Sequence, residues 1–192
     1  MIEAVGLIEL TSVGIGFVVE DAMLKAGDVK LVLARTICSG KYIIVVTGPV
    51  AEATAAVDAG LAAAPEGIID HEVIPRLHPA VLKALSQAVE LTVPLGAGAG
   101  AAAPKAVGII ETFSGVSVLL AGDVAAKTGN ITLLKIHLAM ALGGKGYLMM
   151  AGSVSDVQMA VHAGAEVVRR KGLLVSAVTI PGPSHELFAE YI

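Results

Sequence analysis

The stretch Ala-Val-Gly-Leu-Ile-Glu at residues 4–9 decides the fold, because it occurs twice in the chain. It returns as Ala-Val-Gly-Ile-Ile-Glu at residues 106–111, which lie 102 positions later. A short apolar run of this kind predicts a buried strand. Because a glycine and a glutamate keep their places in both runs, we interpret the match as part of an internal repeat and not as chance apolar similarity.

The similarity extends outward from both strands. Residues 4–35 match residues 106–137, and residues 40–60 match residues 144–164 after an insertion of two residues in the second repeat. Between the repeats, residues 93–105 are rich in Gly, Ala and Pro, which predicts a linker. We therefore expect a tandem duplication with a first domain at 1–92 and a second at 106–192.

Both repeats are expected to have the order β-α-β-β-α-β, the ferredoxin-like split βαβ arrangement of α+β proteins. In the second repeat, Ser153 and Asp156 stand in the relation of N-cap and N3 and predict the start of a helix. A tight turn is expected at residues 38–40. Strands are predicted at 4–10, 29–37, 41–47, 68–74 and 173–180, and helices at 16–26, from Pro49 to about Gly60, and from Ser153 to about Lys171.

The composition raises the question of a membrane protein, since 55% of the residues are hydrophobic and the mean hydropathy is +0.80. The longest stretches without Asp, Glu, Lys or Arg are residues 91–104 and 172–185, each shorter than the roughly 20 apolar residues of a spanning helix. No signal peptide is expected at the N-terminus, because it lacks a basic region. The excess of small apolar side chains suggests burial between subunits.

Charge and cysteine content narrow the function classes further. The net charge is −4 and no basic run occurs, so the sequence carries no electrostatic footprint for nucleic acid. A single cysteine makes no internal disulfide and fits a reducing cytosol.

The two repeats resemble the bacterial microcompartment shell domain. Besides the strand motif, the resemblance rests on Asp21 with Lys25, on Ser-Gly-Lys at 39–41 and on Ile-Pro-Arg-Leu-His at 74–78. Two such domains in one chain are similar to the tandem-domain trimeric shell proteins, in the non-permuted order with the strand motif first. The resemblance implies a structural protein of the microcompartment shell in the cytoplasm. It also implies that three chains form a pseudohexameric disc and that discs tile edge to edge with other shell proteins.

The resemblance also implies residues at the tile edges. The family's edge lysine falls on Lys25 and Lys127, and its edge arginine falls on Arg76. The second repeat reads Ile-Pro-Gly-Pro-Ser-His at 180–185 and has no arginine there. Equal tiling through all six edges is therefore not expected. Without the family pattern, the three charges are ordinary solvated side chains.

Cys38 is the most informative residue under this resemblance. The turn between the second and third strands lines the central pore in this family, which implies Ile37, Cys38, Ser39 and Gly40 as pore-lining residues. Thr-Ile-Cys-Ser-Gly-Lys at 36–41 is similar to the turn of the propanediol-utilisation type, which holds a [4Fe-4S] cluster. This implies one cluster per trimer, with Cys38 as the metal ligand of each subunit. The cluster would serve electron transfer across the shell or delivery to encapsulated redox enzymes.

Three other interpretations of Cys38 remain. One is a purely structural tile in which Cys38 plugs the axis. A lone cysteine is most often a buried small hydrophobe, although a Ser-Gly turn is an unusual place for one. The alternative function is a shell tile with a metabolite pore lined by residues 38–40 and no cluster. An enzyme is not expected, because His71-Glu72 and His185-Glu186 lack the second histidine of HExxH and no GxSxG motif occurs.

Overall fold

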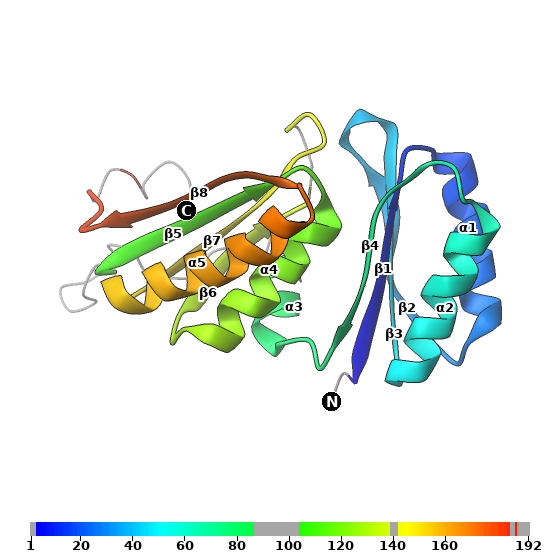
Figure 1. The fold of residues 1–192 in the computed structure, drawn as a ribbon, viewed down its shortest axis with the longest axis horizontal. Coiled ribbons are helices and arrows are strands. Elements are labelled where there is room, and N and C mark those ends of the chain that lie inside the picture. Colours follow the sequence, from blue (N-terminus) through cyan, green and yellow to red (C-terminus); the bar gives the residue numbers. More distant parts are fainter. Residues whose placement is uncertain (1–2, 87–103, 139–141, 185–186, 188–192) are drawn as a thin grey trace. The chain divides into compact units, whose positions relative to one another are not determined.

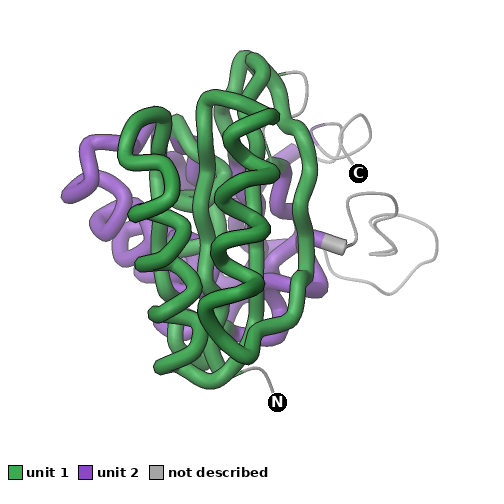
Figure 2. Tube along the Cα trace, turned by 90° about the vertical axis from the view of Figure 1, so that its right-hand side faces the viewer, with its two compact units in different colours: residues 1–77, 113–120, 138–146 green, residues 78–112, 121–137, 147–192 purple. Residues whose placement is uncertain are grey.

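The computed structural model describes residues 3–86, 104–138, 142–184 and 187. They form two compact units, shown in green and purple in Figure 2. The first unit comprises residues 1–77, 113–120 and 138–146, and the second comprises residues 78–112, 121–137 and 147–192. Segments of the second repeat therefore belong to the first unit. Most of the linker predicted at 93–105 lies outside the described residues, as do residues 139–141 of the second-repeat turn.

The first unit is built on a four-stranded antiparallel sheet with the strand order β2-β3-β1-β4. Helices α1 and α2 pack against each other and cover one face of this sheet (Figure 1). The elements are β1 (Ala4–Leu10), α1 (Val13–Ala26), β2 (Lys30–Ile37), the 3-10 turn η1 (Cys38–Gly40), β3 (Lys41–Gly48), α2 (Val50–Ala63) and β4 (Ile68–Pro75).

The second unit repeats the sheet, with the order β6-β7-β5-β8. Helix α5 packs on β5 and β8, and helix α3 packs against β6. The elements are α3 (Pro79–Ser86), β5 (Ala106–Thr112), α4 (Gly115–Thr128), β6 (Thr132–His137), β7 (Gly146–Gly152), α5 (Val154–Arg170) and β8 (Leu174–Pro181). Helix α4 begins in residues of the first unit and ends in residues of the second.

The predicted order β-α-β-β-α-β is confirmed in both repeats. The N-cap at Ser153 is also confirmed, because its side chain accepts the backbone N–H of Asp156 at 3.2 Å. Helix α1 begins at Val13 and not at residue 16, because Ser12 serves as its N-cap. Helix α3 was not predicted, since its eight residues are too few for a clear apolar period.

Strand β1 is buried over its whole length, on both faces of the sheet. Successive side chains of a strand point to opposite faces. Ile8 and Leu10 join Val19 and Met23 of α1 in the hydrophobic core. Glu9 lies on the opposite face, and its side chain is completely buried. The strand motif thus contributes to two buried layers.

The glycine of the repeated motif lies where a helix crosses the strand. A Cβ atom on Gly6 would lie 2.9 Å from the Val57 side chain of α2. A Cβ atom on Gly108 would lie 2.5 Å from the Val161 side chain of α5. The glycine therefore permits the close approach of helix and strand in both repeats.

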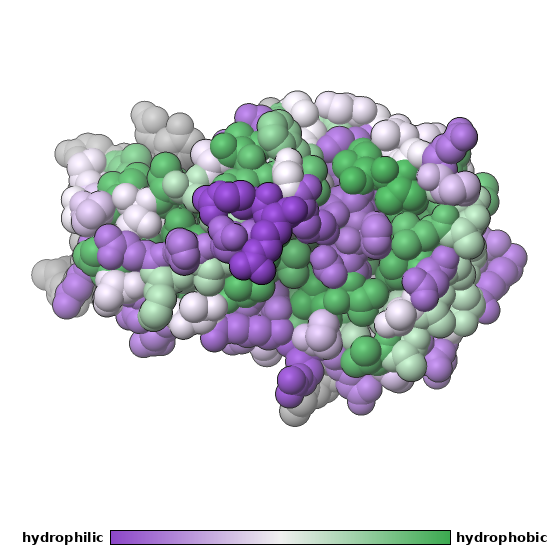
Figure 3. All heavy atoms as spheres, viewed as in Figure 1, coloured by the Kyte–Doolittle hydropathy of each residue, from purple (hydrophilic) through white to green (hydrophobic). Residues whose placement is uncertain are grey.

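Part of the apolar excess lies at the surface. Helix α1 exposes Ile15, Phe17, Val18 and Leu24. Figure 3 shows hydrophobic residues at the surface among hydrophilic ones. Among the described helices, none is both long enough and apolar enough to cross a membrane.

We predict that Gly6→Ala lowers the free energy of unfolding by about 1–3 kcal/mol, because the added methyl group overpacks the contact with α2. Urea unfolding followed by circular dichroism measures the change. Val32→Thr, at an exposed position of β2, serves as the control and is expected to stay within about 0.5 kcal/mol of the wild type. Equal stability of Gly6→Ala and the wild type would show that α2 can shift to accept the methyl group.

Candidate functional site

The turn η1 presents Cys38 at the tip of the β2–β3 hairpin. Ile37 is buried, Cys38 is half-buried, and Ser39 and Gly40 are exposed. Ser39 and Gly40 both have left-handed backbone conformations, with φ of 66° and 72°. Such a conformation is uncommon for a residue other than glycine. A Cβ atom on Gly40 would meet nothing within 4 Å, so the tip of the turn is open.

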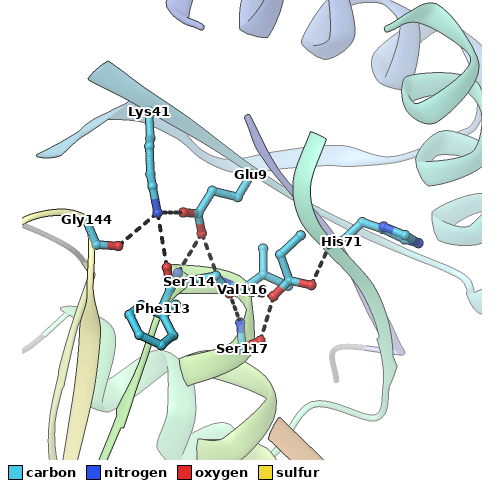
Figure 4. Close-up of polar contacts among 10 residues, drawn as sticks. Glu9, Lys41, His71, Phe113, Ser114, Val116, Ser117 and Gly144 are labelled. Carbon is cyan, nitrogen blue, oxygen red and sulfur yellow. Dashed lines mark hydrogen bonds and ion pairs between the residues drawn. The ribbon is translucent and has the colours of Figure 1, made fainter. Parts of the chain in front are cut away.

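Lys41 anchors the base of this turn (Figure 4). Its Nζ atom donates to Oε1 of Glu9 at 2.9 Å, to the carbonyl of Phe113 at 3.1 Å and to the carbonyl of Gly144 at 3.0 Å. An ammonium group has three N–H donors, and all three are used here. The lysine next to the cysteine turn therefore joins the first repeat to two segments of the second repeat within the first unit.

Glu9 completes the connection by capping α4. Its Oε2 atom accepts the backbone N–H of Gly115 at 2.6 Å and that of Val116 at 3.4 Å. These are orphan donors of the first helical turn, where a negative charge also interacts favourably with the helix dipole. We call the contacts of Glu9 and Lys41 with Phe113, Gly115, Val116 and Gly144 the Glu9 cap.

A second carboxylate supports the same helix start. Asp70 is paired with Glu9 in the β1–β4 register. It accepts the hydroxyls of Ser114 and Ser117, the latter at 2.6 Å, and the backbone N–H of His71 at 2.9 Å (Figure 4). The hydroxyl of Ser114 in turn accepts the backbone N–H of Ser117 at 2.9 Å, as an N-cap does. Two carboxylates of one sheet thus hold the start of α4.

Burial raises the pKa of Glu9 above its usual value, although the hydrogen bond and charge of Lys41 and the amides of Gly115 and Val116 lower it in part. Every buried side-chain nitrogen or oxygen in the described part of the chain has a hydrogen-bond partner. The Glu9 cap is therefore a satisfied structural network, in which no acidic or basic side chain is left to act on a substrate.

The predicted tile-edge residues are all exposed. Lys25 pairs with Asp21 at 2.5 Å on α1, and Lys127 pairs with Asp123 at 2.6 Å on α4. The equivalent ion pairs have different surroundings, since Asp123 is buried and also accepts the backbone N–H of His78 at 2.7 Å. Arg76 has a left-handed backbone with φ of 50°.

The Glu9 cap was not predicted from the sequence. Two signals for it were present: a glutamate in a strand that is otherwise apolar, and a lysine directly after the Cys38 turn. Both recur in the second repeat as Glu111 and Lys145. These signals did not predict the contact itself, because the amides that Glu9 caps lie 106 and 107 positions away in the sequence.

The described part of one chain contains no group of three or more His, Cys, Asp or Glu side chains placed to hold a metal ion. Within the described residues, Cys38 therefore does not belong to a complete set of metal ligands. The thiol is half-buried in a turn whose tip is open at Gly40.

We predict that Lys41→Met lowers the free energy of unfolding by about 3–5 kcal/mol, because it leaves the buried Glu9 carboxylate without its cation. Urea unfolding at neutral pH measures the loss. Lys30→Met, at an exposed position of β2, is the matched control and should unfold close to the wild type. Coincident unfolding curves for Lys41→Met and the wild type would contradict a stabilising role for this ion pair.

The pKa of Glu9 gives a second prediction. Because the folded-state pKa is raised, folding favours the protonated form, and the stability linked to Glu9 is lost as the pH rises above the ordinary value of 4.5 through the folded-state pKa. The unfolding free energy of the wild type minus that of Glu9→Gln should therefore fall as the pH rises above 4.5, until Glu9 is ionised in the folded protein as well. Urea titrations across this range test it, with the exposed Glu66→Gln as the control. A constant difference would contradict the raised pKa.

Comparisons with known proteins identify the family. The BMC domain matches residues 4–77 and again residues 106–183. The bacterial microcompartment shell protein PduT of Citrobacter freundii is 37% identical over 192 residues, covering 100% of this chain and 99% of that protein. The carboxysome assembly protein CcmO of Synechocystis is 30% identical over 185 residues, covering 93% of this chain and 61% of that protein.

Solved structures agree with the sequence comparisons. A microcompartment protein from Desulfitobacterium hafniense has a TM-score of 0.78 at 38% identity, with 98% of this chain and 99% of that chain covered. The fused permuted shell protein MSM0275 has a TM-score of 0.62 at 18% identity, with 88% and 82% covered, and supports the fold alone. The family's proteins are structural components and not enzymes. With two BMC domains in tandem, this chain belongs to the bacterial microcompartment shell proteins.

Proposed function

We propose that this shell protein assembles as a homotrimeric pseudohexamer in the shell facet and carries one [4Fe-4S] cluster on the three-fold axis, held by Cys38 of each subunit. The cluster serves electron transfer across the shell or delivery to encapsulated redox enzymes. One observation carries the proposal. The only thiol of the chain is half-buried at the tip of a hairpin that is anchored at its base by Lys41.

The donor chemistry supports this assignment. Cysteine thiolates are the usual ligands of iron–sulfur clusters, and one thiol per chain gives three on a three-fold axis. Three irons are then held by the protein, and the fourth takes water, a small molecule or a partner side chain. When bound, such a cluster supplies one-electron redox chemistry. Backbone N–H groups of the turn are hydrogen-bond donors for its sulfurs, and contacts of that kind tune the reduction potential.

The remaining proposals concern the other shell proteins that the disc contacts and the location of the shell in the cell. We assign Lys25, Arg76 and Lys127 to the edges at which the disc meets other shell proteins, because all three side chains are exposed. We place the shell in the cytoplasm. Ile37 backs the cysteine turn from inside the chain, while Cys38, Ser39 and Gly40 face the axis.

A tile with a metabolite pore lined by residues 38–40 is the second candidate. The open space beside Gly40 favours it, because no atom of the described residues lies within 4 Å of a Cβ atom placed there. A bound cluster would block the axis at this level, so cluster and open pore exclude each other. The metal content of the purified protein therefore separates the two functions.

We predict that anaerobically purified protein contains four irons and four sulfides per three chains and gives an electron paramagnetic resonance signal when reduced. Cys38→Ala should abolish both the iron and the visible charge-transfer absorption and leave the trimer intact, because the thiolate is the ligand. Ser39→Ala, the adjacent control, should keep the iron. Wild-type protein without iron or sulfide would exclude the cluster and favour the open pore. If Cys38→Ala dissociated the trimer, the residue would be structural.

A further inference from the structure

The outer faces of α2 and α5 differ, although the two helices occupy equivalent places in the repeats. Each helix buries one face against its own sheet and exposes the opposite face. On α5 the exposed face has Met159 and His162. At an offset of 104 positions, α2 has Ala55 and Asp58 instead, which are also exposed. The second repeat thus presents larger side chains than the first.

The end of α5 is strongly basic. Arg169 and Arg170 end the helix, and Lys171 follows directly. The two arginine side chains are 54% and 76% exposed, and both pair with Glu166, at 2.6 Å and 3.2 Å. Three cations and one carboxylate leave a net charge of +2 on this segment. Figure 3 shows hydrophilic residues gathered over the end of α5.

The fold itself does not require these cations. In the first repeat α2 ends at Ala63, and Ala-Pro-Glu-Gly at 64–67 follows, with Glu66 as its only charge. The end of α5 is already closed by its backbone, because Gly172, with φ of 71°, donates its N–H to the carbonyl of Arg169 at 2.9 Å. The same helix end is therefore acidic in one repeat and basic in the other.

The two outer faces are complementary in size and in charge. Helix α2 contains no lysine or arginine, and Asp58 and Glu66 are both exposed. A surface of large basic side chains matches one of small and acidic side chains. We call the first surface the α5 face, formed by Met159, His162, Arg169 and Arg170, and the second the α2 face, formed by Ala55, Asp58, Ala62 and Glu66.

The contact between the repeats leaves both faces open. The Glu9 cap joins β1, the lysine after the Cys38 turn and the start of α4, and it includes no residue of either face. The lysines assigned to the tile edges, Lys25 and Lys127, lie on α1 and α4. Neither the contact between repeats nor the proposed edges therefore cover the α2 face or the α5 face.

We propose that two discs of this chain pair face to face, with the α5 face of each chain on the α2 face of a chain in the other disc. A two-fold axis between the discs preserves each residue's distance from the three-fold axis, so equivalent positions of the two repeats meet. Arg170 then meets Glu66, and Met159 packs on Ala55. The inference rests on the homotrimeric disc of the proposed function but not on the cluster.

Symmetry explains why the partner is a second copy. The two repeats alternate around a pseudohexameric disc, so acidic and basic helix ends alternate as well. A two-fold axis that passes between adjacent repeats places every α5 face over an α2 face, and the assembly closes at two discs with dihedral symmetry. An acidic protein covering the disc would instead meet Asp58 and Glu66 at every second repeat, where like charges repel.

The pairing should be sensitive to salt. Exposed ion pairs are individually weak and are screened by dissolved ions. Here the same contact is repeated for every chain, so the repeated contacts act together. We expect particles of two discs at about 0.05 M NaCl and single discs at about 0.5 M NaCl, where the screening length is short.

The test uses charge reversal in the full chain, with particle masses measured by mass photometry at low salt. The wild type should form particles of six chains. Arg170→Glu and Glu66→Arg, each alone, place like charges together and should leave particles of three chains. The double variant Glu66→Arg/Arg170→Glu restores the opposite charges and should return six chains. Lys105→Glu, an exposed reversal outside both faces, is the control and should keep the wild-type mass.

Each outcome decides the question. Wild-type particles that remain at three chains overturn this proposal alone, and so does pairing that survives both single reversals or fails to return in the double variant. A monomeric wild type overturns the proposed disc and this pairing with it. Far-UV circular dichroism identifies a variant that fails to fold. In that case Ala55→Arg replaces it, because a large cation on the α2 face should also stop assembly at three chains.

Discussion

The buried carboxylate of Glu9 is the interaction on which the first unit depends. A charge in a sheet interior is costly unless it is paired and hydrogen-bonded. Here Lys41 supplies the opposite charge and the first amides of α4 supply the hydrogen bonds. Removing any member leaves another group buried without its partner. The start of α4 is consequently tied to the first repeat, and this explains why residues 113–120 belong to the first unit.

The same interaction connects folding to the cysteine turn. Lys41 directly follows Gly40, so the residue that neutralises Glu9 also fixes the end of the hairpin tip. A side chain on Gly144 would come within 3.0 Å of Lys41 and 3.5 Å of the Ser39 hydroxyl. The position of Cys38 is therefore set by contacts with both repeats and not by its own hairpin alone.

The sequence predicted the fold well, and the physical reasons are local. The duplicated strand motif, the turn at residues 38–40 and the N-cap at Ser153 are all patterns that neighbouring residues define. The start of α1 was predicted at residue 16 and lies at Val13, because Gly14 and Gly16 weaken the helical pattern. Ser12 caps the helix. The Glu9 cap could not be predicted, since its contacts join residues 72 to 107 positions apart, except for the Glu9–Lys41 pair itself. A glutamate in an apolar strand indicates a buried carboxylate but does not indicate which residues contact it.

The placement of Cys38 in only one of two repeats has a numerical consequence. A ring of identical single domains presents as many thiols at its axis as it has domains. In a chain that joins two domains and keeps the cysteine in one, the thiols equal the number of chains, which is half the number of domains. Duplication followed by divergence of this turn thus sets how many identical ligands can converge, independently of the local geometry of the turn. The ratio of one thiol to two domains therefore follows from the tandem arrangement of the repeats in one chain.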